Sequence, residues 1–152
     1  MSVVLKRLKI LLRLVKDSIT NYYDREGYIL NLFLVFIGGG IGSVARYIVT
    51  TLVKNFTTIN FPFGTLTVNV MGSLLMGLIT ALIAGKLSYD SEPVRLLLAV
   101  GFLGGFTTFS SFSIETLTLI EKHEIFYAIA NILTNTTFGL LAAYLGFKII
   151  VH

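Results

Sequence analysis

Four long apolar segments constrain the fold of this chain more than any other feature. They lie at residues 29–53, 62–85, 94–119 and 125–150. A bilayer core about 30 Å thick needs roughly 20 apolar residues per helix, and each segment meets that length. Only 13% of the residues are charged and 55% are apolar, which is too little charge for a soluble domain. The sequence predicts an all-α membrane protein with four transmembrane helices.

Residues 1–28 have a different composition from the domain predicted at 29–152. Cations alternate there with Leu and Val: Lys6, Arg7, Lys9, Arg13 and Lys16. A spanning helix pays roughly 2.5–3.5 kcal/mol for each central Lys or Arg, and no uninterrupted apolar core leads to a signal-peptide cleavage site. We expect an amphipathic helix on the membrane surface, with a partly disordered basic tail as the alternative.

Several kinds of chemistry are excluded by composition. Cysteine is absent, and the two histidines, His123 and His152, fall in a predicted loop and at the C-terminus. No His, Lys or Asp lies deep enough in an apolar segment to activate a serine, so we expect no enzyme. The net charge of +4 is concentrated near the N-terminus, which indicates membrane orientation rather than nucleic-acid binding.

Small and polar residues recur at helical spacing in three of the segments. They are Gly38, Gly39, Gly42 and Ser43 in the first, Thr65, Asn69, Gly72, Ser73 and Gly77 in the second, and Tyr127, Asn131, Asn135 and Gly139 in the fourth. Such stripes let helix backbones approach closely or bond one another, and they can also line a water-accessible path. Spacing alone leaves both interpretations open.

The third segment contains a sequence that predicts a helix break. Gly104 and Gly105 are followed, after one residue, by the β-branched Thr107 and Thr108, and both residue types weaken a helix. Freed carbonyl oxygens in a membrane need partners, and discontinuous helices often give them to a cation. No carboxylate lies nearby, so sodium is more plausible than a divalent ion. Hydrogen bonding to another helix is the alternative.

Phe109 and Phe112, three residues apart with serines between them, share one helix face. Phenylalanines in membrane helices most often face lipid or the core. An aromatic ring has a positive edge, however, so edges turned toward a narrow path would favour a small anion without trapping it. Asn69 and nearby hydroxyl groups would add hydrogen-bond donors.

Three sequence blocks together resemble the Fluc, or CrcB, family of fluoride channels over residues 31–150. They are Gly38-Gly-Gly-Ile-Gly-Ser-Val-Ala-Arg-Tyr47, Gly64-Thr-Leu-Thr-Val-Asn-Val-Met-Gly-Ser73 and Gly104-Gly-Phe-Thr-Thr-Phe-Ser-Ser-Phe-Ser113. The resemblance implies a dual-topology antiparallel dimer in the cell membrane. It also implies two passive fluoride pathways and a central structural sodium ion (Na+).

The same resemblance implies roles for individual residues. Gly104 and Thr107 would give sodium their backbone carbonyls. The fluoride pathway would comprise Asn69, Phe109, Phe112, Thr65, Thr108, Ser111, Arg46, Asn131 and Asn135. Asn131 and Asn135 stand where the family pattern has tyrosine and serine. Glu115 matches a family glutamate.

Purely structural roles for two of these residues, and functions other than a fluoride channel, stay open. Arg46 is also typical of a snorkelling residue near a helix end, and Glu115 of a solvated charge. A small proton-coupled cation exporter is the main rival, but it would normally need a carboxylate deep in a helix. A purely structural membrane subunit is another.

Flanking charges predict which way the chain inserts. One side of the membrane would carry Arg13, Lys16, Arg25, Lys86, Arg95 and Lys148, and the other only Lys54 and Lys122. Without the three cations of the N-terminal extension, the two sides are nearly balanced. We expect the extension to favour an orientation with the N-terminus inside. An antiparallel dimer would then need a minority of inverted copies or a second, oppositely oriented paralogue, and we favour the paralogue.

Labelling of Thr57→Cys from each side of intact cells tests this bias, because the native chain has no cysteine. A thiol reagent should react almost entirely from outside the cell, where the predicted first loop lies. Similar labelling from both faces would contradict the bias and restore a simple homodimer.

Overall fold

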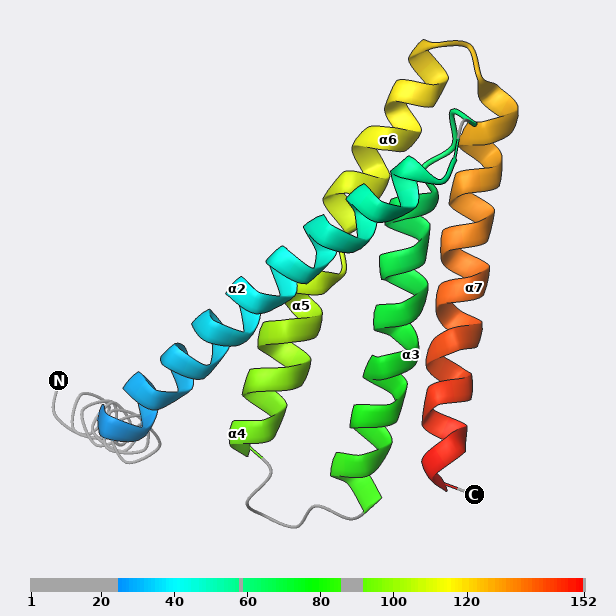
Figure 1. Ribbon diagram of the computed structural model, residues 1–152. Helices are drawn as coiled ribbons and strands as arrows, with labels where there is room; N and C mark the ends of the chain where they lie inside the picture. The colour runs from blue at the N-terminus through cyan, green and yellow to red at the C-terminus, as the bar shows by residue number, and fades with distance from the viewer. Residues whose placement is uncertain (1–24, 58, 86–91, 152) are drawn as a thin grey trace, which may run out of the picture. The chain divides into compact units, whose positions relative to one another are not determined.

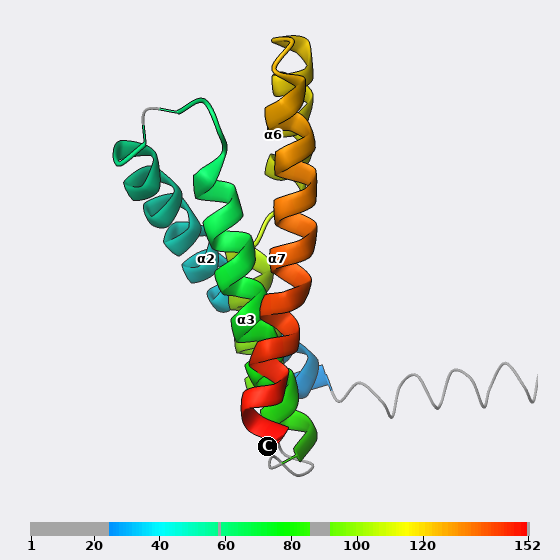
Figure 2. The ribbon, with the colours of Figure 1, turned by 90° about the vertical axis from the view of Figure 1, so that its right-hand side faces the viewer.

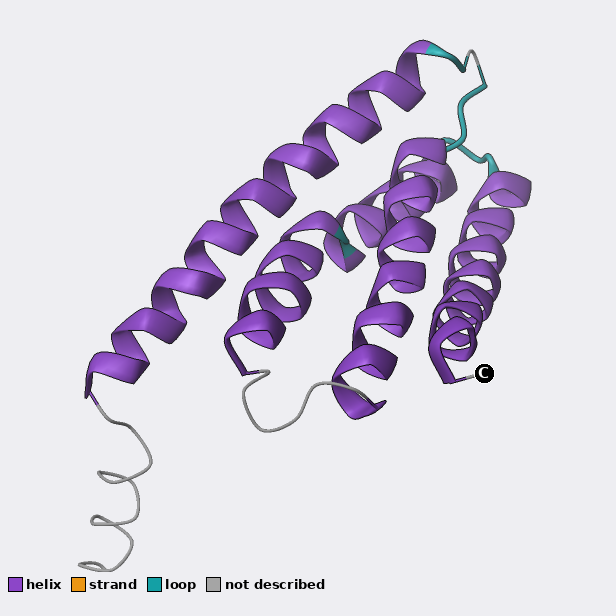
Figure 3. Cartoon of the chain, turned by 60° about the horizontal axis from the view of Figure 1, so that its bottom comes forward, coloured by secondary structure: helices purple, strands orange, loops and turns teal. Residues whose placement is uncertain are grey.

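The computed structural model describes residues 25–57, 59–85 and 92–151, and these form helices joined by short loops and turns (Figure 3). The helices are α2 (Arg25–Asn55), α3 (Phe63–Gly85), α4 (Glu92–Val94), η1 (Arg95–Leu103), α5 (Gly104–Phe106), α6 (Phe109–Glu121) and α7 (Ile125–Val151). The chain divides into two units, residues 1–33 and 34–152, and residues 1–24 of the first lie outside the described structure. The predicted surface helix or tail at 1–28 falls almost entirely outside the described residues.

Four helical spans are long and apolar enough to cross a membrane. They are Gly27–Asn55, Phe63–Gly85, Glu92–Glu121 and Ile125–Val151. The predicted all-α membrane fold is confirmed at this level, with boundaries within a few residues of those expected. Pro62 directly precedes α3, and Glu92 and Pro93 open α4, positions where proline and an acidic residue are tolerated or favoured.

Helices α3 and α7 pack side by side along much of their lengths (Figures 1 and 2). Glycines permit the close approach, because a Cβ on Gly77 would meet the Ala143 carbonyl oxygen and one on Gly146 would meet the Leu74 carbonyl oxygen. In lipid the hydrophobic effect gives little drive for association, so van der Waals contact between backbones becomes important.

From Leu34 onward, α2 crosses the third span with similarly close backbone contact. A Cβ on Gly38 would meet the Leu97 carbonyl oxygen, and a Cβ on Gly42 would meet that of Phe102. The third span reciprocates, since a Cβ on Gly105 would meet the Gly39 carbonyl oxygen. The glycine stripe predicted in the first segment is therefore a helix-packing surface.

The third span contains a non-helical segment between α5 and α6. Thr107 has φ/ψ of −85°/161° and Thr108 has −154°/119°, both extended. Gly72 of α3 lies against this segment, because a Cβ there would meet the Thr107 methyl group. Glycine packing thus holds both α2 and α3 close to the two extended threonines.

The connection between α2 and α3 contacts the turn between α6 and α7. Asn60 Nδ2 donates to Glu124 Oε1 at 2.8 Å, and the Phe61 ring lies 6.2 Å from that of Tyr127, centroid to centroid. His123 in the turn has a φ of 59°, the left-handed conformation that often ends a helix. The loop and the turn are therefore joined at one end of the helices.

Substituting glycines on α2 tests the backbone contact. Gly42→Ala should lower the apparent melting temperature of the purified protein, because its Cβ would overlap the Phe102 carbonyl. A Cβ on Gly27, at the start of the same helix, would have no atom within 4 Å of it, so Gly27→Ala should leave the melting temperature unchanged or raise it slightly through helix propensity. Equal melting temperatures for the two variants in detergent would contradict the contact.

Candidate functional site: a polar pocket beside an extended segment

The Asn69 side chain bonds both backbone groups of Thr108. Its Oδ1 accepts from the Thr108 N–H at 2.9 Å, and its Nδ2 donates to the Thr108 carbonyl oxygen at 3.2 Å. In a continuous α-helix the Thr108 N–H would instead donate to the carbonyl of Gly104. Asn69 therefore replaces helical hydrogen bonds that the extended segment lacks.

Thr108 is also the N-cap residue of α6. Its Oγ1 accepts from the Ser111 backbone N–H at 3.2 Å and donates to Ser111 Oγ at 3.1 Å. Ser, Thr, Asp and Asn are favoured at this position because the side chain satisfies an N–H that has no helical partner. The positive end of the α6 dipole and two hydroxyl groups consequently meet at this point.

A chain of amide hydrogen bonds extends from Asn69 across α7 to α6. Asn69 Nδ2 donates to Asn135 Oδ1 at 3.0 Å, and Asn135 Nδ2 donates to Asn131 Oδ1 at 2.8 Å. Asn131, which is fully buried, donates to Thr116 Oγ1 at 2.9 Å. Thr116 Oγ1 then donates to the Phe112 carbonyl. For Asn131 the structure supports the helix-bonding interpretation, since its side chain is not accessible.

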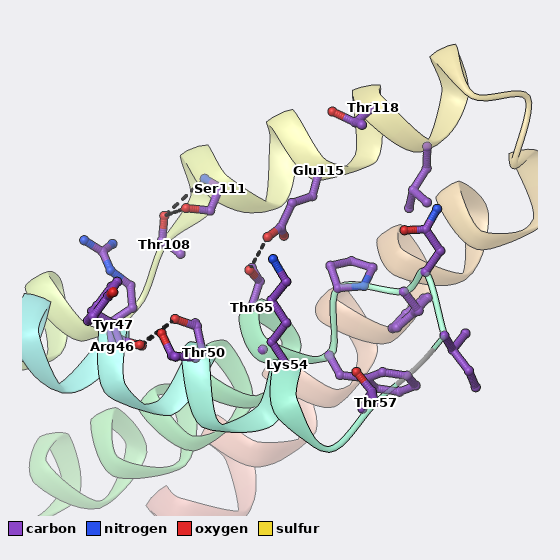
Figure 4. A pocket seen from close by; sticks show the side chains of 18 of the residues that line it. Arg46, Tyr47, Thr50, Lys54, Thr57, Thr65, Thr108, Ser111, Glu115 and Thr118 are labelled. Carbon is purple, nitrogen blue, oxygen red and sulfur yellow. Dashed lines mark hydrogen bonds between the residues drawn. The ribbon is translucent and has the colours of Figure 1, made fainter.

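A cavity of about 720 Å³ opens between the second half of α2, the start of α3 and α6. Figure 4 shows hydroxyl groups around it, with Lys54 extending from α2 toward the bonded pair Thr65 and Glu115. Its polar lining comprises Ser43, Arg46, Tyr47, Thr50, Thr51, Lys54, Thr57, Asn60, Thr65, Thr108, Ser111, Glu115, Thr118 and Lys122. Three cations and one carboxylate among many hydroxyl donors make it a site suited to an anion.

Arg46 connects this pocket to the extended segment. Its Nη1 donates to the Thr107 carbonyl oxygen at 3.3 Å, and its side chain is half-buried. The one salt bridge found within the described part of the chain joins Glu92 and Arg95. Arg46 therefore has no carboxylate within salt-bridge distance among the described residues, and its charge is not neutralised by the protein there.

Glu115 is not the solvated helix-end charge considered from the sequence. Thr65 Oγ1 donates to Glu115 Oε1 at 2.8 Å, while Glu115 Oε2 is buried and accepts no hydrogen bond. Both residues line the pocket. An accepting carboxylate oxygen without a donor is costly in a low-dielectric site, so Oε2 can take a further donor or a proton.

The predicted pathway residues fall into three groups: an amide network, the pocket lining and the phenylalanine pair. Asn69, Thr108, Asn131 and Asn135 share the amide network, and the pocket is lined by Arg46, Thr65, Thr108 and Ser111. Phe109 and Phe112 do not line this pocket. Their ring centroids are 5.4 Å apart; within one chain Phe109 is 78% exposed and Phe112 is half-buried.

The carbonyls of Gly104 and Thr107, which the resemblance assigns to sodium, do not receive the hydrogen bonds of a continuous helix. The Thr108 N–H donates to Asn69 rather than to Gly104, and the Ser111 N–H donates to Thr108 Oγ1 rather than to Thr107. Gly104 is exposed, and a Cβ there would have no atom within 4 Å of it. No cluster of three or more His, Cys, Asp or Glu lies among the described residues, so oxygen ligands would come mainly from the backbone.

Several residues at the site were not predicted from the sequence. Lys54 and Lys122 were considered only as flanking charges, and Thr116 was not considered. Lys54 lies in the last turn of α2 and Lys122 follows α6, and folding brings both to one pocket. Because the two lysines are far apart in the sequence, no local pattern indicates that they line the same pocket.

The cap on α6 can be tested with two identical substitutions. Thr108→Val removes the acceptor for the Ser111 N–H and should cost about 1 kcal/mol of stability. Thr134→Val removes a hydroxyl that bonds carbonyls of its own helix, so its effect on the apparent melting temperature should be smaller. A Thr134→Val protein as unstable as Thr108→Val would contradict the cap.

Comparison with known proteins agrees with the resemblance of the three blocks. Residues 33–147 match the family model described as "CrcB-like protein, Camphor Resistance (CrcB)". The chain is 48% identical over 117 residues to the "Fluoride-specific ion channel FluC" of Coxiella burnetii (strain CbuK_Q154), covering 77% of this chain and 94% of that protein. It is 45% identical over 120 residues to the protein of the same name from Shewanella frigidimarina (strain NCIMB 400), covering 79% and 95%. The chain is a multi-pass membrane protein that belongs to the CrcB family.

Proposed function

We propose that this protein is a fluoride-selective channel that lets fluoride leave the cytoplasm passively through the cell membrane and so relieves fluoride toxicity. The observation that carries the proposal is the hydroxyl-rich, cation-bearing pocket that ends at Thr108 and Ser111. The relatives also support the proposal, because the match covers 94% of a protein named as a fluoride-specific ion channel.

The pocket offers what a small, strongly hydrogen-bonding anion requires. Lys54, Lys122 and Arg46 raise the local concentration of anions. Hydroxyl donors of Thr65, Thr108 and Ser111 can replace part of the hydration shell as the anion moves inward. These donors are neutral, so they stabilise the anion without the deep electrostatic well that a buried full charge would create.

We propose that a second, antiparallel subunit, either an identical chain or a paralogue, completes the pathway. Phe109 is 78% exposed in the single chain, although it is adjacent to the capped end of α6. The α2 face that carries Phe36, Ile41 and Val44 is likewise apolar and exposed. A partner packed there would bring its own groups to the phenylalanine pair.

We further propose that the Thr107–Thr108 segment is the helix break expected in the third span, and that it helps to hold sodium. Gly104 and Thr107 would bind the ion through backbone carbonyls, with matching groups from the second subunit. A bound sodium ion would supply a fixed positive charge and cross-link the two subunits at that point. Asn69 and Thr108 keep the two carbonyls free of helical hydrogen bonds.

Fluoride efflux from liposomes containing the purified protein tests the function. Fluoride should leave down its own gradient at channel-like speed, without ATP and without a proton gradient, while chloride stays inside. Comparable chloride flux would contradict selectivity. Fluoride movement that needs a proton gradient would favour a coupled transporter, with Glu115 as the carboxylate to examine.

The phenylalanine pair can be tested with a matched control. Phe109→Ile and Phe112→Ile should each lower fluoride flux at least tenfold, because isoleucine keeps apolar bulk but has no positive ring edge. Phe126 on α7 is 79% exposed, close to the value for Phe109, so Phe126→Ile should leave flux near the wild-type rate. Wild-type flux in both pair variants would reduce the pair to packing residues.

A further inference from the structure

The Thr107 carbonyl oxygen lies where the proposed cation site and the anion pocket meet. It accepts a hydrogen bond from Arg46 Nη1 at 3.3 Å, and it is one of the two oxygens proposed to hold sodium. The side chain of Arg46 also lines the pocket, together with Thr108 and Ser111. The Arg46 guanidinium group therefore contacts a carbonyl oxygen proposed to bind sodium and also lines the pocket proposed to admit fluoride.

Arg46 and a cation cannot share this oxygen without cost. Like charges that both contact one carbonyl oxygen lie only a few ångströms apart, and the apolar surroundings screen them weakly. Carboxylates that might offset the two charges are absent from salt-bridge distance of Arg46 within the described part of the chain. When either the Arg46 guanidinium or a cation is bound to the oxygen, the other therefore binds there more weakly.

We infer that Arg46 is a positioning residue that couples the cation site to the anion pocket. Its guanidinium group donates hydrogen bonds either to the Thr107 carbonyl oxygen or to the transported anion. While Arg46 donates to this oxygen, its charge is partly held by the backbone. When the oxygen is taken by a cation, the guanidinium is released beside Thr108 and Ser111, where it can bond an anion. This inference rests on the proposed sodium and fluoride sites and adds a linkage between them.

Thermodynamic linkage gives the inference a definite sign. If release of Arg46 favours the anion, fluoride must favour the cation by the same factor. Fluoride should therefore lower the sodium concentration that half-saturates the site. The effect should depend on Arg46 and not on pocket cations in general.

The first test measures the melting temperature of the purified, assembled protein against sodium concentration, with a large organic cation keeping ionic strength constant. Arg46→Met removes both the competing donor and its charge, so the sodium midpoint should fall about tenfold. Lys54→Met removes a cation that lines the same pocket but makes no hydrogen bond to the Thr107 carbonyl, and its midpoint should match wild type. An unchanged or higher midpoint in Arg46→Met, or an equal fall in Lys54→Met, would overturn the inference.

The second test repeats the titration with and without saturating fluoride. Fluoride should lower the wild-type sodium midpoint about fivefold or more, and this shift should vanish in Arg46→Met. Arg46→Gln carries the same expectation and serves where the methionine variant does not fold. No shift in the wild type, or a full shift in the folded Arg46 variant, would overturn the coupling.

These readouts separate the inference from the channel proposal, because neither measures flux. Selective fluoride efflux without any effect of sodium on stability would leave the channel intact and overturn both the sodium site and the coupling. Sodium binding with the expected Arg46 dependence, but without efflux, would support the cation competition and overturn the transport function.

Discussion

A peptide group without a hydrogen bond costs several kcal/mol in lipid, and Thr107 and Thr108 place such groups in the middle of a membrane span. Asn69 meets this cost from a neighbouring helix by bonding both the N–H and the carbonyl of Thr108. The Thr108 hydroxyl lowers this cost further, because it accepts a hydrogen bond from the Ser111 N–H and so caps α6. The direction of α6, the hydroxyl groups of the pocket and the carbonyls released from helical hydrogen bonds beside it all depend on these few bonds.

The position of Asn69 and Arg46 depends in turn on contact between backbones. Gly72 lies against Thr107 and is less than one turn from Asn69, while Gly42 lies against Phe102 and is four residues from Arg46. Any larger side chain at either glycine would move Asn69 or Arg46 with its helix. Because the spacing between the helices is set by peptide groups rather than by adaptable side chains, it tolerates little variation.

Much of the fold could be predicted from the sequence because membrane thickness and small-residue spacing are strong constraints. The four apolar segments correctly predicted the four spans. The stripe at Gly38 and Gly42 indicated a surface that does pack closely against another helix. The contacts of the site could not be predicted in the same way. Lys54, Glu115 and Lys122 come together only through tertiary packing, and nothing local distinguishes a pocket glutamate from a solvated one.

In the fluoride pathway that we propose, the hydrogen bonds of the Asn69 amide would affect the kinetics of transport. Both of its N–H groups and its oxygen already have protein partners, namely Thr108 and Asn135. An anion that binds this amide must displace one of those acceptors, so arrival is an exchange of hydrogen bonds rather than a gain of new ones. Exchange between comparable partners has a small free-energy difference in either direction. The amide can then recognise the ion and still release it quickly, with the displaced protein group returning as the ion departs.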